Sequence, residues 1–310
     1  MILCASPNLC RDRILVVRDF ETGRVHRAEQ VVVRAGGKGL NVARVVRALG
    51  GSLTLVGFVG GSAGRAIVRE ATACGLLLDP VRMPGESRTC TLVVDPDGSE
   101  TVINEAGAPV GDDQVRALRR RVGRHLKRSH VVVLTGSLLP GMPPDFYAAV
   151  IQEAAPRPTI LDTSGEALRR GAEAGPTGVK CNRRELEGIL GRALPTVADV
   201  AEASRALLAW GTGWIAVTLG AQGATLVTRD GSWLLRPPRV QRANAIGAGD
   251  GFTAGMAVGF TRGLSLVDAA RLGTAAAAAD VATLLPGTVE RTTVEALVPK
   301  VGVESVEAGV

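Results

Sequence analysis

The segment Asn244-Ala245-Ile246-Gly247-Ala248-Gly249-Asp250-Gly251-Phe252-Thr253-Ala254-Gly255-Met256 decides how the rest of the chain is interpreted. It is typical of a tight turn that opens a helix, because Gly247 and Gly249 adopt backbone angles that other residues resist. From Phe252 onward the residues are small or apolar, which suits a buried helix. The backbone amides of Gly247, Ala248 and Gly249 would lie at the positive end of this helix, and they predict a site for an anion, most naturally phosphate.

Asp250 is the only acidic residue in this segment. A carboxylate beside a bound phosphate repels it unless the carboxylate has a chemical role. One such role is to take a proton from a hydroxyl group that then attacks phosphorus. The alternative is that Asp250 only stabilises the first turn of the helix. On this segment alone both interpretations stay open.

The composition favours a soluble enzyme. The chain has 310 residues, of which 46% are hydrophobic and 21% charged, enough for one large α/β domain or two smaller ones. Aromatic residues make up only 3%, which argues against platforms for stacking bases. The net charge is +6, with one basic cluster at Arg116–Arg128 whose apolar residues share a helical face. We interpret that cluster as a solvated helix and expect no nucleic-acid partner, since a basic surface also suits anionic ligands.

Cysteine and histidine usage predicts neither disulfides nor a histidine metal site. The five cysteines are scattered without a Cys-x-x-Cys pair, and we interpret them as reduced packing residues. The three histidines form no metal-binding constellation. The sequence shows no basic-then-apolar leader and no apolar run long enough to span a bilayer. We therefore expect a cytoplasmic protein with no membrane partner.

Apolar runs and helical patterns alternate along the chain. Short strand-like runs such as Met1–Ser6, Leu53–Val59 and Val131–Leu134 are separated by amphipathic segments. This alternation predicts an α/β fold of one domain, residues 1–310, with a mainly parallel sheet and helices on both faces. Ligands of such sheets gather at the carboxyl ends of the strands. The loops expected at that edge are 136–141, 162–165, 180–185, 218–223 and 244–250.

A second group of strands mixes polar and apolar residues. Arg88–Val94 and Glu100–Asn104 flank Pro96-Asp97-Gly98, which predicts a hairpin. With strands drawn from about residues 10–35, the segment 86–105 is expected to form a small β lid outside the main sheet. The exposed edges of a lid sheet lead us to expect a homodimer through the lid. The tail from Gly302 is expected to be mobile.

A second glycine-rich segment, Ala35-Gly36-Gly37-Lys38-Gly39-Leu40-Asn41-Val42-Ala43, places three glycines around Lys38. It predicts close approach of the backbone to a ligand, followed by a helix over residues 41–49. It is not a Walker A loop, because Val32 and Gly39 stand where that motif needs Gly and Ser or Thr.

These segments together resemble the ribokinase-like carbohydrate kinases of the phosphofructokinase-B family. Gly36–Ala43 is similar to the family's first signature, and Asn244–Met256 is similar to its second. Four more segments match in the same order: Thr135–Gly141, Leu161–Leu168, Lys180–Leu186 and Leu219–Ala224. One glycine-rich loop would be weak evidence, whereas six segments in order are specific. The resemblance runs nearly end to end and implies a three-layer ribokinase-like sandwich with a small β lid.

The resemblance also implies a reaction, namely the phosphorylation of a ketose phosphate by ATP with Mg²⁺. The segment Val179–Leu207 most resembles the 1-phosphofructokinases, which implies fructose 1-phosphate as substrate and fructose 1,6-bisphosphate as product. Tagatose 6-phosphate and fructose 6-phosphate remain alternative substrates. Asp250 would be the general base, and the amides of Gly247, Ala248 and Gly249 would hold the charge that develops on the transferred phosphoryl group.

Further roles are implied only by matching positions of the family. The positions that bind sugar hydroxyls match Asp12, Gly37 and Asn41. Lys38 and Arg88 match positions that hold the phosphate already on the substrate, and an arginine fork suits that task. Glu105 lies where the family's lid meets the sugar. The nucleotide side matches Lys180, Asn182, Glu185, Thr218, Gly220 and Gly223, with Asn182 and Glu185 also near Mg²⁺ and acting through water.

The chain departs from the family's pattern at several positions. Asn8-Leu9-Cys10-Arg11-Asp12 replaces the usual Asn-Pro-Ala-x-Asp, which loosens that turn. Cys181 stands where a proline is expected, Ala245 replaces a common Thr, and Gly251 replaces a common Ser. These departures keep open a second hypothesis, a catalytically weak sensor of sugar phosphates or nucleotides. A dinucleotide oxidoreductase is disfavoured, because no Gly-x-Gly-x-x-Gly turn follows the first strand.

Overall fold

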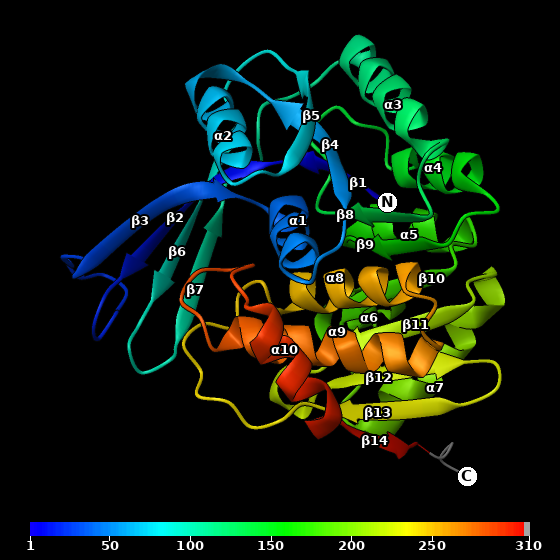
Figure 1. The fold of residues 1–310 in the computed structure, drawn as a ribbon. Coiled ribbons are helices and arrows are strands. Elements are labelled where there is room, and N and C mark those ends of the chain that lie inside the picture. Colours follow the sequence, from blue (N-terminus) through cyan, green and yellow to red (C-terminus); the bar gives the residue numbers. More distant parts are fainter. Residues whose placement is uncertain (307–310) are drawn as a thin grey trace.

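A ten-stranded sheet forms the centre of the computed structural model, which describes residues 1–306 (Figure 1). Seven strands run parallel, in the spatial order β5 (Leu77–Arg82), β4 (Leu53–Val59), β1 (Ile2–Asn8), β8 (Val131–Thr135), β9 (Thr159–Asp162), β10 (Gly178–Asn182) and β11 (Trp214–Thr218). Three antiparallel strands extend the sheet beyond β11, namely β12 (Ala224–Thr228), β13 (Ser232–Arg236) and β14 (Gly302–Ser305). The chain leaves β1 toward β4 on one side and returns to β8 on the other. The order therefore reverses at β1, a place where α/β sheets bind ligands.

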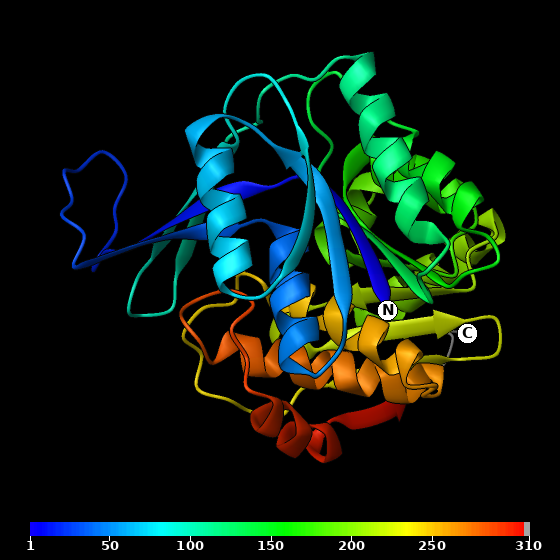
Figure 2. The same cartoon turned by 45° about the horizontal axis from the view of Figure 1, so that its top comes forward.

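Helices cover both faces of this sheet (Figures 1 and 2). One layer contains α1 (Lys38–Ala48), α2 (Gly61–Ala73), α8 (Ala248–Thr261), α9 (Leu266–Val281) and α10 (Arg291–Leu297). The other contains α3 (Asp112–Leu126), α4 (Phe146–Ala154), α5 (Gly165–Glu173), α6 (Arg183–Leu190) and α7 (Val197–Leu207). Short 3₁₀ turns occur at Leu208–Trp210, Gly220–Gln222 and Val298–Lys300. Along β1, Ile2 and Cys4 join the first core while Leu3 and Ala5 join the second, as the two-residue period of a strand requires.

A separate four-stranded sheet projects from one side of the core (Figures 1 and 2). We call it the lid sheet, and its strands lie in the order β3 (Gln30–Gly36), β2 (Cys10–Val16), β6 (Arg88–Val94) and β7 (Glu100–Asn104). Its inner face packs through Ile14, Leu92 and their neighbours against Ile246 and Leu284 of the core. Glu100 adds a polar contact, because its carboxylate accepts the Ala245 amide at 2.5 Å.

The predicted fold class is confirmed, and several boundaries were wrong. The first helix begins at Lys38 rather than at residue 41, because Gly37 adopts a φ of 94° and starts the helix there. The first strand continues through Pro7 to Asn8, because Asn8 still pairs with Phe58 of β4 after a register shift that accommodates the proline. The predicted hairpin of residues 88–94 and 100–104 is confirmed.

The expected mobile tail was also wrong over residues 302–305. These residues form β14, which pairs with β13 from Gly302↔Arg236 to Ser305↔Trp233. Residues 307–310 lie outside the described part. Residues 77–82, for which no strand was expected, form the edge strand β5. Leu77 at its start is 59% exposed, so this strand lacks a continuous buried run.

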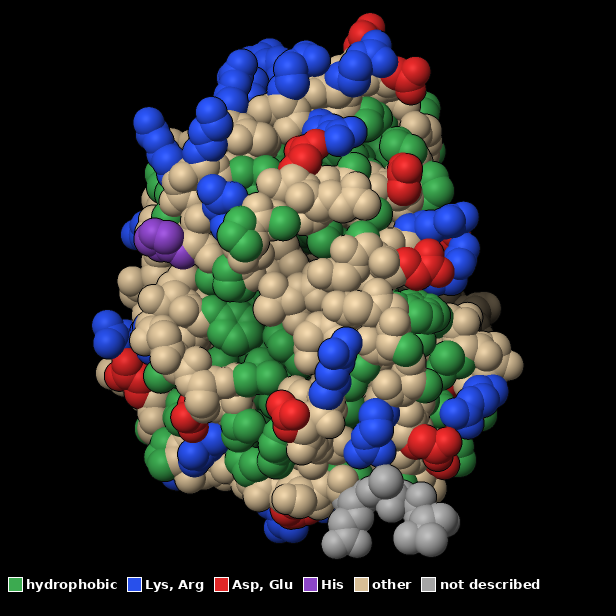
Figure 3. Space-filling model, turned by 90° about the vertical axis from the view of Figure 1, so that its right-hand side faces the viewer, with side chains coloured by type: hydrophobic (Ala, Val, Ile, Leu, Met, Phe, Trp, Pro, Cys, Tyr) green, Lys and Arg blue, Asp and Glu red, His purple; other side chains and the backbone are tan. Residues whose placement is uncertain are grey.

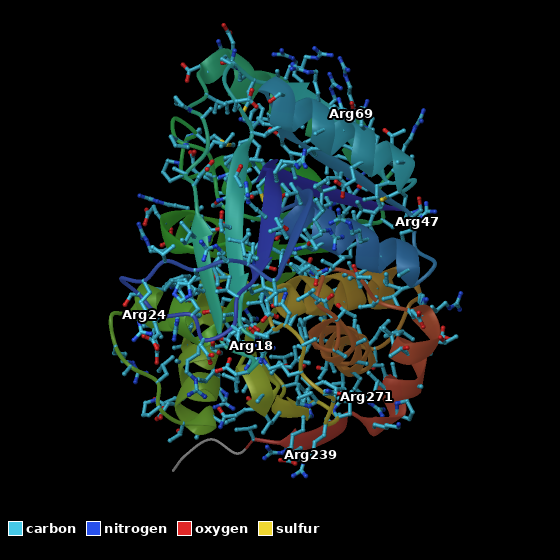
Figure 4. The ribbon with its side chains drawn as sticks, turned by 90° about the vertical axis from the view of Figure 1, so that its left-hand side faces the viewer. Arg18, Arg24, Arg47, Arg69, Arg239 and Arg271 are labelled. Atoms are coloured by element: carbon cyan, nitrogen blue, oxygen red, sulfur yellow. The ribbon has the colours of Figure 1, made fainter. Side chains whose placement is uncertain are left out.

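Basic side chains are dispersed over the surface. Figure 3 shows Lys and Arg near the top of one face and mixed with acidic side chains elsewhere. On α3, Arg116 pairs with Asp113 and Arg119 pairs with Glu153, which agrees with a solvated helix. On the opposite face, the six labelled arginines are spread over different elements (Figure 4). Within residues 1–306, no helix has the length and hydropathy needed to cross a membrane.

Candidate active site

Two glycine-started helices bring the two signature segments together. Gly37 precedes α1 with a φ of 94°, and Gly247 precedes α8 with a φ of 97°. Only a residue without Cβ adopts such angles easily. In the first turns of these helices, the Asn41 side-chain amide donates to Asp250 Oδ2 at 2.9 Å. Residues 209 positions apart in the chain therefore share one hydrogen bond beneath the carboxyl edge of the sheet.

A buried charge network surrounds this contact. We define it as Lys38, Asp162, Lys180 and Asp250. Lys38 Nζ lies 2.8 Å from Asp162 Oδ1 and 3.5 Å from Asp250 Oδ1, and Lys180 Nζ lies 3.3 Å from the same Asp162 oxygen. Thr253 on α8 donates to the other Asp162 oxygen at 2.9 Å. Asp162 is fully buried, so its charge depends on these partners.

The network shifts the pKa values of its two carboxylates in opposite directions. Burial raises the pKa of Asp250, and nearby Asp162 adds to the rise while Lys38 opposes it. Burial acts in the same direction on Asp162, but Lys180 and Lys38 outweigh it and hold the pKa of that carboxyl below its usual range. A pair of carboxylates separated in this way can divide two tasks between them. The raised pKa makes Asp250 the better proton acceptor of the two, whereas Asp162 stays ionised and orients the lysines.

The turn before α8 presents amide groups beside the lysines. The Asp250 and Gly251 amides donate to Gly247 O at 2.8 and 2.9 Å, and the Ala248 amide makes a longer bond of 3.3 Å to Ala245 O. Within residues 1–306, the Gly247 and Gly249 amides have no hydrogen-bond partner. A Cβ at Gly249 would lie 2.5 Å from Lys180 Nζ, so this lysine touches the turn. The arrangement combines unpaired amides, a helix N-terminus and two ammonium groups, which suits a phosphoryl group.

Asp12 lies on the lid sheet directly over the first glycine-rich segment. A Cβ at Gly36 would overlap the Asp12 carboxylate, which explains why glycine is needed there. Asp12 is 5% exposed, and burial raises its pKa, while a hydrogen bond from Cys10 and the charges of Arg44 and Arg34 oppose the rise. The carboxylate is thus fixed at the border between the lid sheet and α1.

Arg88 and Glu105 form a second group on the lid. Arg88 donates through Nη1 to Glu105 O at 2.9 Å, and the Glu105 carboxylate accepts the Thr89 amide at 2.8 Å. Within residues 1–306, the buried Arg88 Nε has no hydrogen-bond partner. The structure places Lys38 in the buried charge network instead of in this group. That Lys38 and Arg88 share one bound phosphate therefore stays a prediction.

Asn182 and Glu185 lie together at the start of α6. The Asn182 side chain accepts the Glu185 amide at 2.9 Å, and the Glu185 carboxylate accepts the Asn182 amide at 2.8 Å. This reciprocal pair is a capping box, which gives both residues a structural role. The second carboxylate oxygen of Glu185 accepts no hydrogen bond from residues 1–306. Burial lowers the pKa of Lys38, but Asp162 and Asp250 outweigh it and raise the pKa, and Glu185 adds to this rise. Glu185 therefore borders the network.

The predicted nucleotide-binding turn lies at the next strand. Thr218 ends β11 and pairs in register with Asn182, which ends β10. Gly220 has a φ of 61° and Gly223 a φ of 101°, and the Leu219 amide closes the turn by donating to Gly223 O at 2.7 Å. A Cβ at Gly223 would overlap the carbonyl of Leu235. The turn is therefore fixed by glycines beside Asn182.

Comparison with known proteins decides the family. Residues 3–291 match the pfkB family of carbohydrate kinases. The chain belongs to this family. It is therefore a phosphotransferase of the carbohydrate kinase type.

Relatives of this pfkB kinase cover most of its length. A 1-phosphofructokinase of Rhodobacter capsulatus is 36% identical over 278 residues, covering 88% of each chain. A 1-phosphofructokinase of Escherichia coli K12 is 32% identical over 288 residues, covering 92% of each chain. Among solved structures, a Thermotoga maritima protein described as a possible 1-phosphofructokinase has a TM-score of 0.91 at 26% identity and covers 99% of this chain and 100% of that one. Escherichia coli phosphofructokinase-2 in complex with fructose 6-phosphate has a TM-score of 0.85 at 26% identity, covering 96% and 98% of the two chains.

Sequence reasoning missed Asp162 in this pfkB kinase. The segment Leu161–Leu168 was part of the resemblance to the family, but Asp162 was not among the predicted site residues. The sequence did contain a signal for Asp162 as a site residue. It directly follows the strand-like run Thr159–Leu161, and parallel strands end at the ligand-binding edge. Its two lysine partners come from different elements, so sequence spacing could not pair them.

Proposed function

We propose that this chain transfers the γ-phosphoryl group of ATP to fructose 1-phosphate, giving fructose 1,6-bisphosphate, with Asp250 as the general base. One observation carries the proposal. Asp250 is buried at the start of α8, beside unpaired amides and two lysines, at the carboxyl edge of the sheet. The names of the curated relatives support the choice of fructose 1-phosphate over other ketose phosphates.

Asp250 would accept the proton of the sugar hydroxyl as that oxygen attacks the γ-phosphorus. Asn41 donates a hydrogen bond to Asp250 Oδ2, so Oδ1, which lies 3.5 Å from Lys38 Nζ, would be the oxygen that takes the proton. The raised pKa of Asp250 makes its carboxylate a stronger proton acceptor than an exposed aspartate. A buried acid that only stabilised a helix would need neither this partner nor this position.

The transferred group would be held by donors that are already in place. The Gly247 and Gly249 amides lie at the start of α8 without a partner in residues 1–306, and Lys180 lies against Gly249. Such preorganised donors stabilise charge as it develops and require little rearrangement during the reaction. Lys38 Nζ contacts both Asp162 and Asp250. Its ammonium would therefore stay near the negative charge as that charge moves from the base to the phosphoryl oxygens.

Glu185 and Asn182 fit a water-mediated Mg²⁺ site. Oxygen ligands and retained waters are what Mg²⁺ prefers, and Glu185 keeps one carboxylate oxygen outside the capping box. Mg²⁺ would neutralise part of the charge on the nucleotide phosphates. The glycine turn at Gly220 and Gly223, next to Asn182 in register, would receive the nucleotide.

Asp12, Gly37 and Asn41 would contact the sugar hydroxyls, and Arg88 would hold the phosphate already on the sugar. The buried Nε of Arg88 supports this role, because a phosphate oxygen would satisfy a donor that residues 1–306 leave unpaired. Glu105 fixes Arg88 through its backbone carbonyl, so its part is positioning. The lid sheet would exclude water from the reacting groups.

The outer face of the lid sheet supports a homodimer. Val31, Val33 and Ile103 are large apolar residues that are 49%, 46% and 59% exposed. Exposed apolar residues on a small sheet mark an interaction surface. Val33→Asp should shift the protein toward a monomer in sedimentation analysis, whereas Val25→Asp in the adjoining loop should not. Unchanged sedimentation of the first variant would contradict the lid-mediated dimer.

A substrate panel with Mg²⁺ and ATP tests the proposed reaction. Formation of ADP and of the phosphorylated sugar is measured with fructose 1-phosphate, fructose 6-phosphate, tagatose 6-phosphate, fructose and ribose. We expect the highest kcat/KM with fructose 1-phosphate and very low turnover of the two unphosphorylated sugars, which cannot engage Arg88. A preference for fructose or ribose would contradict the proposed role of Arg88. Ligand binding without turnover would favour the sensor hypothesis.

A further inference from the structure

Three potential metal ligands meet on the inner face of the lid sheet. Cys10 and Asp12 lie two residues apart on β2, and Cys90 lies on the neighbouring strand β6 opposite Asp12. Their ligand atoms all lie within 4.8 Å of one another. Cys10 also donates to Asp12 Oδ1 at 3.1 Å. Ligands of one tetrahedral ion lie at comparable separations, so little movement would be needed to bind one.

The proposed kinase reaction gives these cysteines no task. Cys10 stands where the family pattern has a small alanine, and Cys90 is 4% exposed on the strand behind it. A buried cysteine in an apolar core is usually a packing residue. These two instead face a carboxylate that the proposed reaction assigns to the substrate. Such a set of donors, two thiols and one carboxylate, is typical of a site for a thiophilic cation.

We propose that Cys10, Asp12 and Cys90 form an inhibitory binding site for a thiophilic divalent cation such as Zn²⁺. The two thiols would lose their protons to solvent, and the two sulfur atoms and one Asp12 oxygen would coordinate the ion. A water molecule would fill the fourth position of a tetrahedral site. Coordination would take Asp12 away from the sugar hydroxyl, so the ion would compete with the sugar phosphate.

The charges around the cluster are compatible with this ion. Two thiolates and one carboxylate carry three negative charges, and a divalent cation leaves one of them uncompensated. The hydrogen bond with Cys90 and burial raise the pKa of Cys10, and burial raises the pKa of Asp12. The positive charge of Arg88 opposes the rise at Cys10, and Arg44 and Arg34 oppose the rise at Asp12. These guanidinium groups would disfavour a bare cation but would stabilise the net negative complex.

Cobalt substitution tests the site without reference to activity. The whole protein carrying Cys74→Ser, which removes the exposed cysteine, is titrated with Co²⁺ and then with Zn²⁺. We expect one Co²⁺ per chain, an intense thiolate-to-cobalt absorption band, and loss of that band when Zn²⁺ displaces Co²⁺. Adding Cys90→Ser or Cys10→Ser should weaken Co²⁺ binding by at least about 10- to 100-fold, the range found for changes near metal ligands. Absence of the band in the Cys74→Ser protein would overturn the proposal.

Inhibition kinetics test whether the ion competes with the sugar phosphate. This competition rests on the role of Asp12 in the proposed function. Zn²⁺ should raise the KM for the sugar phosphate and leave the KM for ATP unchanged. Cys90→Ser should retain basal activity and lose the inhibition. If the cobalt band appears but Zn²⁺ does not inhibit, the competition part of the proposal is overturned along with the assignment of Asp12 to the sugar. If Zn²⁺ inhibits equally after Cys90→Ser, the inhibition comes from another site and this one is overturned as its cause.

Discussion

The buried charge network and the lid sheet hold their functional groups in different ways. Asp162 and Asp250 are buried at 0% and 5% exposure, and both contact Lys38 within 3.5 Å. On the lid, Glu105 is exposed, and Arg88 is held by a single backbone carbonyl with its Nε unpaired. The network is fixed by strand ends and two helix starts. The lid depends on a few contacts such as Glu100 with Ala245.

This difference suggests a division of labour. Under the proposed function, the groups that carry out the chemistry lie where the fold allows least movement. Apart from Gly37 and Asn41 at the start of α1, the groups proposed to recognise the substrate lie on the lid sheet, which would close on it. Changes in the network should therefore lower kcat or stability, whereas changes in the lid should raise the KM for the sugar phosphate.

Asp250→Asn should have the largest effect. A general base contributes about 10²- to 10⁴-fold, so kcat should fall within that range while the KM for the sugar phosphate changes little. Asp268→Asn is a matched control, since Asp268 is an exposed first-turn acid of the neighbouring helix α9. Steady-state kinetics compare the two variants. Equal small losses in both would show that Asp250 only stabilises its helix.

Asp162→Asn should destabilise the protein more than any lid substitution. The change leaves the buried Lys180 and the partly exposed Lys38 without their shared counter-charge, and breaking a buried pair costs about 3–5 kcal/mol of unfolding free energy. Urea denaturation measures the loss. Asp113→Asn, at an exposed surface pair, should stay within about 0.5 kcal/mol of the wild type. A loss below 1 kcal/mol for Asp162→Asn would contradict the structural importance of the network, since it would lie at the level of typical single substitutions.

Asp280, a buried acid of helix α9, predicts that stability depends on pH. Burial raises its pKa to about 7, and within residues 1–306 its Oδ2 has no hydrogen-bond partner while Oδ1 accepts the Gly287 amide at 2.7 Å. A raised carboxyl pKa means that the folded state binds the proton more tightly. Asp280 therefore lowers stability as pH rises from about 4 to about 7, and its full cost applies above pH 7.

Asp280→Asn keeps the acceptor for Gly287 and removes this cost. Its gain in unfolding free energy should be larger at pH 8.5 than at pH 5.5 by about 2 kcal/mol. From pH 5.5 to the folded pKa is roughly 1.5 pH units, and each unit contributes about 1.4 kcal/mol. Urea denaturation at the two pH values measures the difference. An equal effect at both would show that Asp280 does not titrate there.

Arg88→Lys should act mainly on substrate binding. A lysine keeps the charge but loses the planar fork, so the KM for fructose 1-phosphate should rise about 10-fold with kcat nearly unchanged. Arg69→Lys, at an exposed arginine of α2 that is labelled in Figure 4 and is not among the site residues, should change neither constant. A loss confined to kcat would assign Arg88 to the chemistry and would break the division between the two regions.

Glu100→Gln should have the smallest effect. The Glu100 carboxylate joins the lid sheet to Ala245 and to Arg242, and the amide keeps an acceptor but loses the charge. We expect a rise of about 3-fold in the KM for the sugar phosphate, corresponding to less than 1 kcal/mol for a weakened charge-assisted contact. Glu290→Gln outside the lid serves as the comparison. An unchanged KM would show that this contact does not help the lid to close.

The sequence predicted the elements whose signals are local. The glycines around Lys38 and Asp250 predicted two tight turns, and strand and helix periodicity predicted the layers of the sandwich. The start of α1 was misplaced, because Gly39 lies within a helix where its lack of Cβ lets it pack against Ser6. The edge strands β5 and β14 were missed, since an edge strand is only partly buried and lacks a clear apolar pattern.

Pairings between distant segments could not be predicted. Nothing near Asp162 in the sequence indicates that Lys38 and Lys180 converge on one of its oxygens. The same holds for Cys10 and Cys90, which the parallel pairing of β2 and β6 brings together. The capping box formed by Asn182 and Glu185 was also not predicted, because a capping box and a ligand site use the same residue types.

A double-mutant cycle of Asp250→Asn and Arg88→Lys tests most directly whether chemistry and recognition are separate. The kcat/KM for fructose 1-phosphate is measured for the wild type, both single variants and the double variant. The two residues belong to separate hydrogen-bond networks, so their effects on the activation free energy should add to within about 0.5 kcal/mol. A coupling energy above about 1.5 kcal/mol would show that the two regions act as one unit and would contradict the account.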